Sequence, residues 1–284
     1  MTTRTADEIR ESVSRAYADR VRPVLMETTA AGAAACCGPD CCENDALETI
    51  ALIDVTPASG EACCETESVT DVQIKQIAGL YAQTDIADLP STVTDVSFGC
   101  GNPTAIAALQ PGETVLDLGS GGGIDCFLAA KMVGPTGQVY GVDMTPEMIA
   151  LARKNAGKVG ATNVEFRLGE IERLPIGDAS IDVIISNCVI NLSPDKDQVF
   201  REAFRVLKPG GRLQVSDIVW TRPVPQEVKD DIEQWAGCIA GALLESEYVG
   251  KIAGAGFGDV TSVATEYPRG KGVASANVVA FKPS

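Results

Sequence analysis

Cysteine is the residue of this chain best able to do chemistry, with 10 copies among 284 residues. Three adjacent pairs stand near the N-terminus and the remaining cysteines are single: Cys36-Cys37, Cys41-Cys42, Cys63-Cys64, then Cys100, Cys126, Cys188 and Cys238. Histidine, the commonest general base of enzymes, is absent from the sequence. Because thiolates bind soft metals and metalloids, this composition predicts a reaction in which sulfur binds a soft centre and no proton has to be abstracted.

The run TVLDLGSGGGIDCFLAAK reads as a buried strand, a glycine-rich turn and the start of a helix. Its glycines Gly119, Gly121 and Gly123 let backbone amides approach a ligand at the helix N-terminus. Asp117 precedes the first glycine by two residues, where a carboxylate is placed for an ammonium group rather than a pyrophosphate. Asp143 ends the next predicted strand and can bind both ribose hydroxyls of a nucleoside.

A third acid follows the third predicted strand, in the run LGEIERLP. Glu170 is placed for an exocyclic amine and Ile171 for one face of an adenine ring. The alternative interpretation of this glycine loop is a Rossmann turn that binds a nicotinamide dinucleotide.

The elements that must position these residues are strands alternating with helices. We expect strands at Thr114–Leu118, Gln138–Val142, Val164–Leu168, Ile181–Ser186, Arg212–Ser216, Gly258–Thr265 and Ala276–Phe281. We expect helices at Ile124–Val133, Pro146–Val159, Lys196–Val206, Gln226–Leu244 and Ser246–Ala255. The last two strands have only a short connection, so they should pair antiparallel. The predicted class is α/β, a Rossmann-like seven-stranded sheet, mostly parallel with an antiparallel last strand, with helices on both faces.

The chain divides into three predicted regions. An amphipathic helix occupies residues 1–28, with apolar positions from Ile9 to Val24 and an end at Pro23. Residues 29–95 form a cysteine-rich flexible segment and lid, and residues 96–284 form the cofactor-binding domain.

The charge balance limits the partners of this chain. With 23 basic and 39 acidic residues, the net charge is −16, which argues against binding to nucleic acid or to an anionic membrane. No apolar run is long enough for a membrane span, and the first residues lack the apolar core of a signal peptide. We therefore expect a cytoplasmic monomer, in a reducing compartment where the thiols serve a metal, metalloid or redox role.

The cofactor loop resembles that of the class I S-adenosylmethionine-dependent methyltransferases. The KPGG run at Lys208–Gly211, expected as a turn before a strand, and the closing antiparallel strand pair are also typical of that superfamily. The resemblance implies S-adenosyl-L-methionine as the cofactor. The residues it implies in cofactor binding are Phe98, Asp117, Gly119, Ser120, Gly121, Asp143, Met144, Glu170, Ile171, Asn187 and Val189.

Three further motifs resemble those of the arsenite methyltransferases: SFGCG, SNCVINLSPDK and WAGCIAGAL. The resemblance implies that their cysteines, Cys100, Cys188 and Cys238, bind As(III) as thiolates. It also implies a further upstream cysteine that forms a disulfide as arsenic is recycled, and Cys63 or Cys64 suits this role by its distance along the chain. Cys126 is expected to pack in the core, and the roles of the pairs at Cys36 and Cys41 stay open.

Trivalent arsenic has a lone pair and no proton to lose, which agrees with the missing histidine. The resemblance implies methyl transfer from the cofactor to As(III), or to its glutathione conjugate, giving mono- and dimethylated arsenicals for arsenic detoxification. A thiol reductant, glutathione or thioredoxin, would be the redox partner. The alternatives are a small-molecule C- or O-methyltransferase of the quinone-biosynthesis type and a non-catalytic soft-metal binding protein, and antimony or selenium could replace arsenic as the soft centre.

Overall fold

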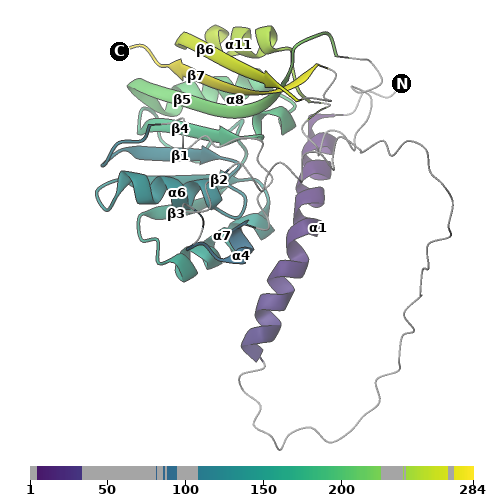
Figure 1. Cartoon of the computed structure of the whole chain (residues 1–284), viewed down its shortest axis with the longest axis vertical. Helices are drawn as coiled ribbons and strands as arrows, with labels where there is room; N and C mark the ends of the chain where they lie inside the picture. The colour runs from purple at the N-terminus through teal and green to yellow at the C-terminus, as the bar shows by residue number, and fades with distance from the viewer. Residues whose placement is uncertain are drawn as a thin grey trace, which may run out of the picture.

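The computed structural model describes residues 5–33, 81, 86, 88–94, 108–224, 239, 241–267 and 272–284 of the chain. Its centre is a seven-stranded sheet with the order β3-β2-β1-β4-β5-β7-β6 (Figure 1). Strands β1 to β5 pair parallel, and β7 pairs antiparallel with both β5 and β6, as predicted. The strands span Thr114–Leu118 (β1), Gln138–Asp143 (β2), Val164–Leu168 (β3), Ile181–Asn187 (β4), Leu207–Trp220 (β5), Gly258–Glu266 (β6) and Val273–Phe281 (β7).

Helices cover both faces of the sheet because side chains of the central strands alternate between two cores. Val115 of β1 packs with the apolar residues of α6 and α7, whereas Leu116 packs with those of α8 and α11. These helices span Ile124–Val133 (α6), Pro146–Val159 (α7), Lys196–Val206 (α8) and Glu245–Gly254 (α11), with short turns at Ser91–Thr94 (α4) and Ile190–Leu192 (η2). The bounds of α6, α7 and α8 are those predicted.

The N-terminal helix α1 (Ala6–Ala33) continues through Pro23, so the prediction that this proline ends the helix was wrong. A proline inside a helix removes one backbone hydrogen bond and costs about 3 kcal/mol. Packing offsets this cost, because Val21 is fully buried against Met148 and Leu151 of α7. Helix α1 therefore lies along the α7 side of the domain (Figure 1).

Strand β5 begins at Leu207, which corrects the prediction of a turn over Lys208–Gly211 followed by a strand from Arg212. Leu207 and Arg212 both pair with β4, but β5 has more residues than β4 in this interval, so the segment between them forms a bulge. Gly210 adopts a φ of 77° there, and its N–H donates to the carbonyl of Lys282 at 3.0 Å. The KPGG run is thus tied into the sheet on both sides.

Of the helix predicted at Gln226–Leu244, the structure describes residues 239 and 241–244, and these are not helical. The backbone N–H of Trp220 donates to Leu243 at 2.8 Å, and Trp220 forms a β-bridge with Leu244. This pairing holds the segment in an extended form until α11 begins. Within the described part of the chain, no helix combines the length and apolarity needed to cross a bilayer.

Candidate active site

A cavity lies where β1, β2 and β4 end. Ligands bind at this carboxyl edge in open α/β sheets, because the loops that follow the strands converge there. The structure brings most of the predicted site residues together around this cavity: Asp117, Gly119, Ser120, Gly121, Asp143, Met144, Ile171, Asn187, Cys188 and Val189.

The glycine loop after β1 is fixed to the neighbouring strand by its backbone. The N–H groups of Gly119 and Ser120 both donate to the carbonyl of Val142, at 2.7 and 3.0 Å. Gly119 has a φ of 71°, and a Cβ atom there would lie 2.4 Å from the methyl groups of Val189. Only glycine therefore suits this position, both for its backbone conformation and for the close approach of the loop after β4.

Two features of the same loop mark a place for a ligand. A Cβ atom added to Gly121 would meet nothing within 4 Å, so the loop leaves open space on the cavity side. Ser120 Oγ is buried and makes no hydrogen bond within the described part of the chain. A buried hydroxyl without a partner is costly, which indicates that a bound molecule supplies the missing hydrogen bond.

The carboxylate of Asp143 is oriented by two backbone donors at the end of β2. The Gly121 N–H donates to Oδ2 at 3.0 Å and the Thr145 N–H donates to Oδ1 at 2.8 Å. Burial raises the pKa of Asp143, and these two hydrogen bonds lower it in part. The carboxylate is thus held in one position at the cavity wall, as binding of two hydroxyls requires.

Asp117 and Cys126 form a pair behind the glycine loop. Cys126 Sγ donates to Asp117 Oδ2 at 3.3 Å, and its thiol is free and buried. Burial, followed by the nearby charge of Asp125, raises the pKa of Asp117 well above its usual value. Burial and the Asp117 charge raise the pKa of Cys126 in turn, so this cysteine is held as a thiol. Cys126 packs in the core beside the site, as we expected from the sequence.

Sequence reasoning missed Asp125, which also lines the cavity. Tyr81 OH donates to both of its oxygens at 3.1 Å, and Asn187 Nδ2 donates to Oδ2 at 3.2 Å. Burial raises the pKa of Asp125 to about 6, against these hydrogen bonds. An acid in the first turn of a helix looks like an ordinary N-terminal charge in a sequence, so only its burial reveals this role.

The cavity is covered by α1, which the sequence did not predict. Arg10, Val13 and Tyr17 contribute to its lining. Arg10 Nη2 lies 3.2 Å from Glu172 Oε1, and Ser193 Oγ donates to the same oxygen at 2.7 Å. A helix from the start of the chain, the loop after β3 and the loop after β4 therefore meet at one buried carboxylate.

Glu170, predicted to contact an exocyclic amine, lies outside the lining of this cavity. Its side chain is 44% exposed and belongs to a neighbouring open groove, where Oε2 lies 3.9 Å from Arg10 Nε. Ile171 and Glu172 line the cavity in its place. The acid that lines the cavity after β3 is thus Glu172, two residues after Glu170.

Cys188 is the arsenic-ligand candidate that the structure describes. It is 2% exposed, and its φ of 59° lies in the left-handed region that non-glycine residues rarely adopt. Its N–H donates to the carbonyl of Ser216 at 2.8 Å, and its sulfur is in a disulfide bond. Because Cys126, the other described cysteine, is free, the disulfide partner lies outside the described residues. Strained backbone of this kind is typical of functional sites.

The other sequence predictions at the site fall outside the described residues. These are Phe98, Cys63, Cys64, Cys100 and Cys238.

Comparison with known proteins agrees with this site. Residues 109–257 match the family model described as a methyltransferase domain. The crystal structure of CrArsM, an arsenic (III) S-adenosylmethionine methyltransferase from Chlamydomonas reinhardtii, superposes with a TM-score of 0.62 at 37% identity, over 71% of this chain and 73% of that one. The chain belongs to the arsenite methyltransferase family.

Curated members of the arsenite methyltransferase family show the same relationship. The arsenite methyltransferase of Halobacterium salinarum is 50% identical over 220 residues, which cover 78% of this chain and 53% of that protein. The human arsenite methyltransferase is 43% identical over 161 residues, which cover 53% of this chain and 42% of that protein. The chain therefore spans about half the length of the curated relatives it matches.

The cavity fits S-adenosylmethionine, the cofactor of class I methyltransferases. The unpaired Ser120 Oγ and the open space at Gly121 leave room and a hydrogen-bonding group for the cofactor. Asp117, Asp125 and Asp143 place three carboxyl groups in the cavity wall, and a ligand that carries an ammonium and a sulfonium charge favours their ionised forms. Asp143 would bind the ribose hydroxyls and Ile171 would contact the adenine ring.

Proposed function

We propose that this protein transfers methyl groups from S-adenosylmethionine to trivalent arsenic held by the thiolates of Cys100, Cys188 and Cys238. The observation that carries the proposal is the position of Cys188, which lines the cofactor cavity directly between Asn187 and Val189. The sequence motifs around the three cysteines and the family membership support the other two ligands.

The chain's own residues prepare the transfer by binding and orientation. Asp117 and Asp125 attract the cationic end of the cofactor, and Asp143 fixes its ribose at the far end of the cavity. When bound, the cofactor supplies an electrophilic methyl group on a sulfonium. Val13 and Tyr17 of α1 cover the cavity and exclude water from this charge.

The acceptor needs positioning rather than a base. Three thiolates would hold As(III) as a pyramid whose lone pair points toward the methyl group. An arsenic–carbon bond forms from the lone pair while the sulfur–carbon bond breaks, which leaves a neutral thioether and formally oxidises arsenic to the pentavalent state. No histidine exists in the chain to act as a base, and this reaction needs none.

A reductant completes the cycle. The two electrons that return arsenic to the trivalent state would come from a pair of thiols, with Cys63 or Cys64 as one partner, which leaves a disulfide. Cys188 is disulfide-bonded in this structure, so it must be reduced before it can bind arsenic as a thiolate. Glutathione or thioredoxin would carry out this reduction, and mono- and dimethylated arsenicals would be the products.

The proposal also assigns parts of the chain to these roles. Residues 96–284 would form the methyltransferase domain, and helix α1 (Ala6–Ala33) would cover it, where the sequence predicted a helix at residues 1–28. The rest of the segment up to residue 95 would deliver Cys63 and Cys64. The active form would be a monomer that takes As(III) or its glutathione conjugate from solution.

The test is methyl transfer from labelled S-adenosylmethionine by the reduced protein, with and without arsenite. Cys188→Ser should abolish arsenic methylation and lower the number of thiolates bound to As(III) by one. Cys126→Ser is the matched control, because a serine hydroxyl keeps the donor to Asp117, and its arsenic coordination should equal that of the wild type. Arsenic methylation that survives unchanged in Cys188→Ser would rule out the three-thiolate site, and transfer to a quinone precursor without arsenite would favour a C-methyltransferase.

A further inference from the structure

A buried polar cluster lies directly behind the segment that carries Cys188. The cluster consists of Asn191 of η2, Asp217 of β5, Tyr248 of α11 and Lys196 of α8, and none of these residues lines the cofactor cavity. Asn191, Asp217 and Tyr248 are each 0% exposed. A buried carboxylate is costly unless it is fully hydrogen-bonded, so its presence in an otherwise apolar core needs a reason.

The carboxylate of Asp217 accepts hydrogen bonds from donors on three elements. Asn191 Nδ2 donates to Oδ1 at 2.7 Å, and the N–H of Ile218 donates to the same oxygen at 3.0 Å. Tyr248 OH donates to Oδ2 at 3.1 Å. The carboxylate therefore joins η2, β5 and α11 at one point.

The side-chain NH₂ group of Asn191 makes a second hydrogen bond to β5. Its Nδ2 also donates to the carbonyl of Ile218 at 2.6 Å, while its buried Oδ1 has no partner among the described residues. An apolar residue would avoid the cost of that unpaired oxygen. The asparagine is thus explained by the two hydrogen bonds of its NH₂ group, which fasten η2 onto β5.

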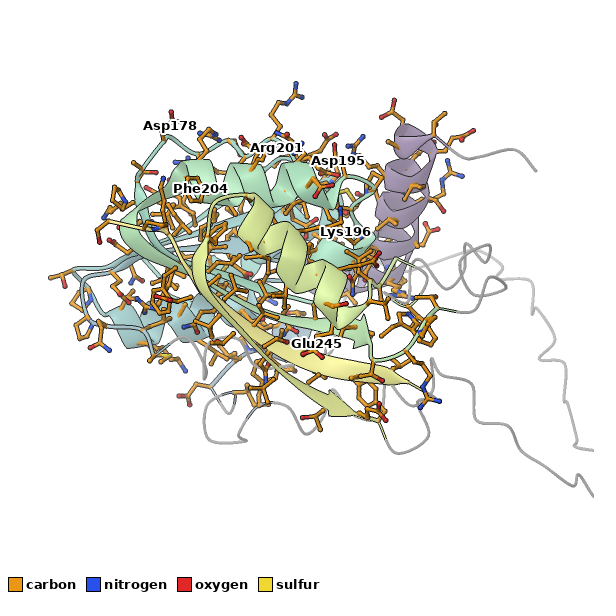
Figure 2. All side chains as sticks on the ribbon, turned by 90° about the horizontal axis from the view of Figure 1, so that it is seen from above. Asp178, Asp195, Lys196, Arg201, Phe204 and Glu245 are labelled. Carbon is orange, nitrogen blue, oxygen red and sulfur yellow. The ribbon has the colours of Figure 1, made fainter. Side chains whose placement is uncertain are left out.

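Lys196 fastens the far end of the same segment. Its buried Nζ donates to the backbone carbonyls of Asn191 and Ser193, at 3.1 and 2.9 Å. Figure 2 shows Lys196 with Asp195 at the N-terminal end of α8. Its positive charge also lowers the pKa of Asp217, which burial raises to about 7.

Two consecutive residues of β5 therefore hold the segment after β4. The carbonyl of Ser216 accepts from the N–H of Cys188, and the carboxylate of Asp217 accepts from Asn191, one helical turn further along. Cys188 has an unfavourable left-handed backbone, which persists only where its surroundings impose it. The hydrogen bonds of Asn191 and Lys196 hold the segment that follows Cys188 against β5 and α8.

We infer that Asp217, acting through Asn191, is a positioning residue that fixes the Cys188 backbone in the conformation needed to bind a soft thiophilic substrate. The inference rests on the proposed function for the identity of that substrate, As(III). The positioning itself is independent of the substrate, because it concerns only where the Cys188 sulfur is held.

Asp217→Asn tests the inference while keeping the shape of the side chain. Asparagine has one acceptor oxygen, so at least one of the three donors would face an NH₂ group. Tyr248→Phe is the milder variant, since it removes one donor and leaves Asn191 paired. Val278→Ala, on β7 in the adjoining core and outside the polar cluster, is the control for a general loss of stability.

The first measurement is the alkylation rate of Cys188 in the reduced full-length protein, followed by peptide mass spectrometry with iodoacetamide as the probe. Asp217→Asn should raise this rate about tenfold, with a smaller rise in Tyr248→Phe and none in Val278→Ala. The second measurement is the Michaelis constant for arsenite, which should rise about tenfold in Asp217→Asn while the dissociation constant for S-adenosylhomocysteine stays the same.

Equal alkylation rates in Asp217→Asn, Tyr248→Phe and Val278→Ala would overturn the inference. A change in alkylation without arsenic-dependent methylation by the wild type would instead contradict the proposed function and leave the positioning role supported.

Discussion

The Arg10 guanidinium lies 3.2 Å from the carboxylate of Glu172, and both residues line the cofactor cavity. Arg10 comes from the N-terminal helix and Glu172 from the loop after β3, so the pair joins distant parts of the chain at the cavity wall. Glu172 is 8% exposed and Arg10 is 22% exposed at the side chain. Removal of one partner from a pair this well buried costs more than breaking an exposed ion pair, because the remaining charge stays buried without compensation.

Arg10→Ala should therefore weaken cofactor binding. Without the guanidinium, the carboxylate of Glu172 keeps the hydroxyl of Ser193 as its donor among the described residues, and α1 is held less firmly over the cavity. We expect the dissociation constant for S-adenosylmethionine to rise about tenfold, which corresponds to about 1.4 kcal/mol. Isothermal titration calorimetry measures this change.

Arg15→Ala is the matched control on the same helix. Arg15 pairs with Glu11 at the exposed surface, where an ion pair contributes little. The affinity of the Arg15→Ala variant for S-adenosylmethionine should equal that of the wild type. Equal affinities in Arg10→Ala and the wild type would contradict a closing role for α1.

Gly119→Ala should abolish cofactor binding by moving the loop that follows β4. The added Cβ would lie 2.4 Å from two methyl carbons of Val189, so the two cavity walls must separate. Gly160→Ala tests the backbone contribution alone, since Gly160 has a φ of 70° and a Cβ there meets nothing within 4 Å. Both variants should lose about 1–2 kcal/mol of stability from the left-handed backbone, but only Gly119→Ala should lose cofactor affinity.

Thermal unfolding and calorimetry separate these two effects. Similar losses of affinity in both glycine variants would show that backbone strain, rather than the contact with Val189, governs binding.

Cys126→Ala should reduce cofactor affinity although this thiol does not line the cavity. The thiol donates to Asp117 and thereby lowers the pKa of that carboxyl, so its loss raises the pKa of Asp117 further. We expect the dissociation constant for S-adenosylmethionine to rise about fivefold at neutral pH, because Asp117 loses one hydrogen bond to its carboxylate. Cys126→Ser keeps a donor in place and should recover most of the affinity in the same titration.

The sequence predicted the parts of this site that depend on local geometry. Asp117, Gly119 and Asp143 follow from a strand, a tight turn and the next strand end, and each lies at the cavity as expected. The bounds of α6 and α8 were predicted for the same reason, because helix periodicity and end signals are local.

What the sequence could not predict depends on contacts between distant segments. Arg10 meets Glu172 only because Val21 docks α1 on α7, and no local pattern shows where an amphipathic helix packs. The Cys188 N–H likewise donates to Ser216 of β5, a contact between segments that are distant in the sequence. The prediction that α1 ends at Pro23 was wrong because packing against α7 overrides the helix-breaking tendency of proline.

Cofactor binding should weaken as the pH falls through about 6, the pKa to which burial raises Asp125 in the free protein. Burial also raises the pKa of Asp117 well above its usual value. A bound cation favours the ionised carboxylates, so binding must release protons that the free protein holds at low pH. Above these pKa values the groups are ionised in both states and the affinity is constant. Below them, each group that must lose a proton raises the dissociation constant about tenfold per pH unit.

Calorimetry at pH 7.5 and pH 5.5, in buffers of different ionisation enthalpy, measures both the affinity and the protons released. Asp125→Asn has no proton to lose at this position, so its affinity should be lower than that of the wild type at neutral pH but should change less between the two pH values. Retention of the full wild-type pH dependence in Asp125→Asn would assign the released protons to Asp117 or Asp143. Tyr81 and Asn187 donate to the two oxygens of Asp125, and asparagine offers one acceptor oxygen, so this variant removes a hydrogen bond together with the charge, which is why its affinity at neutral pH should be lower.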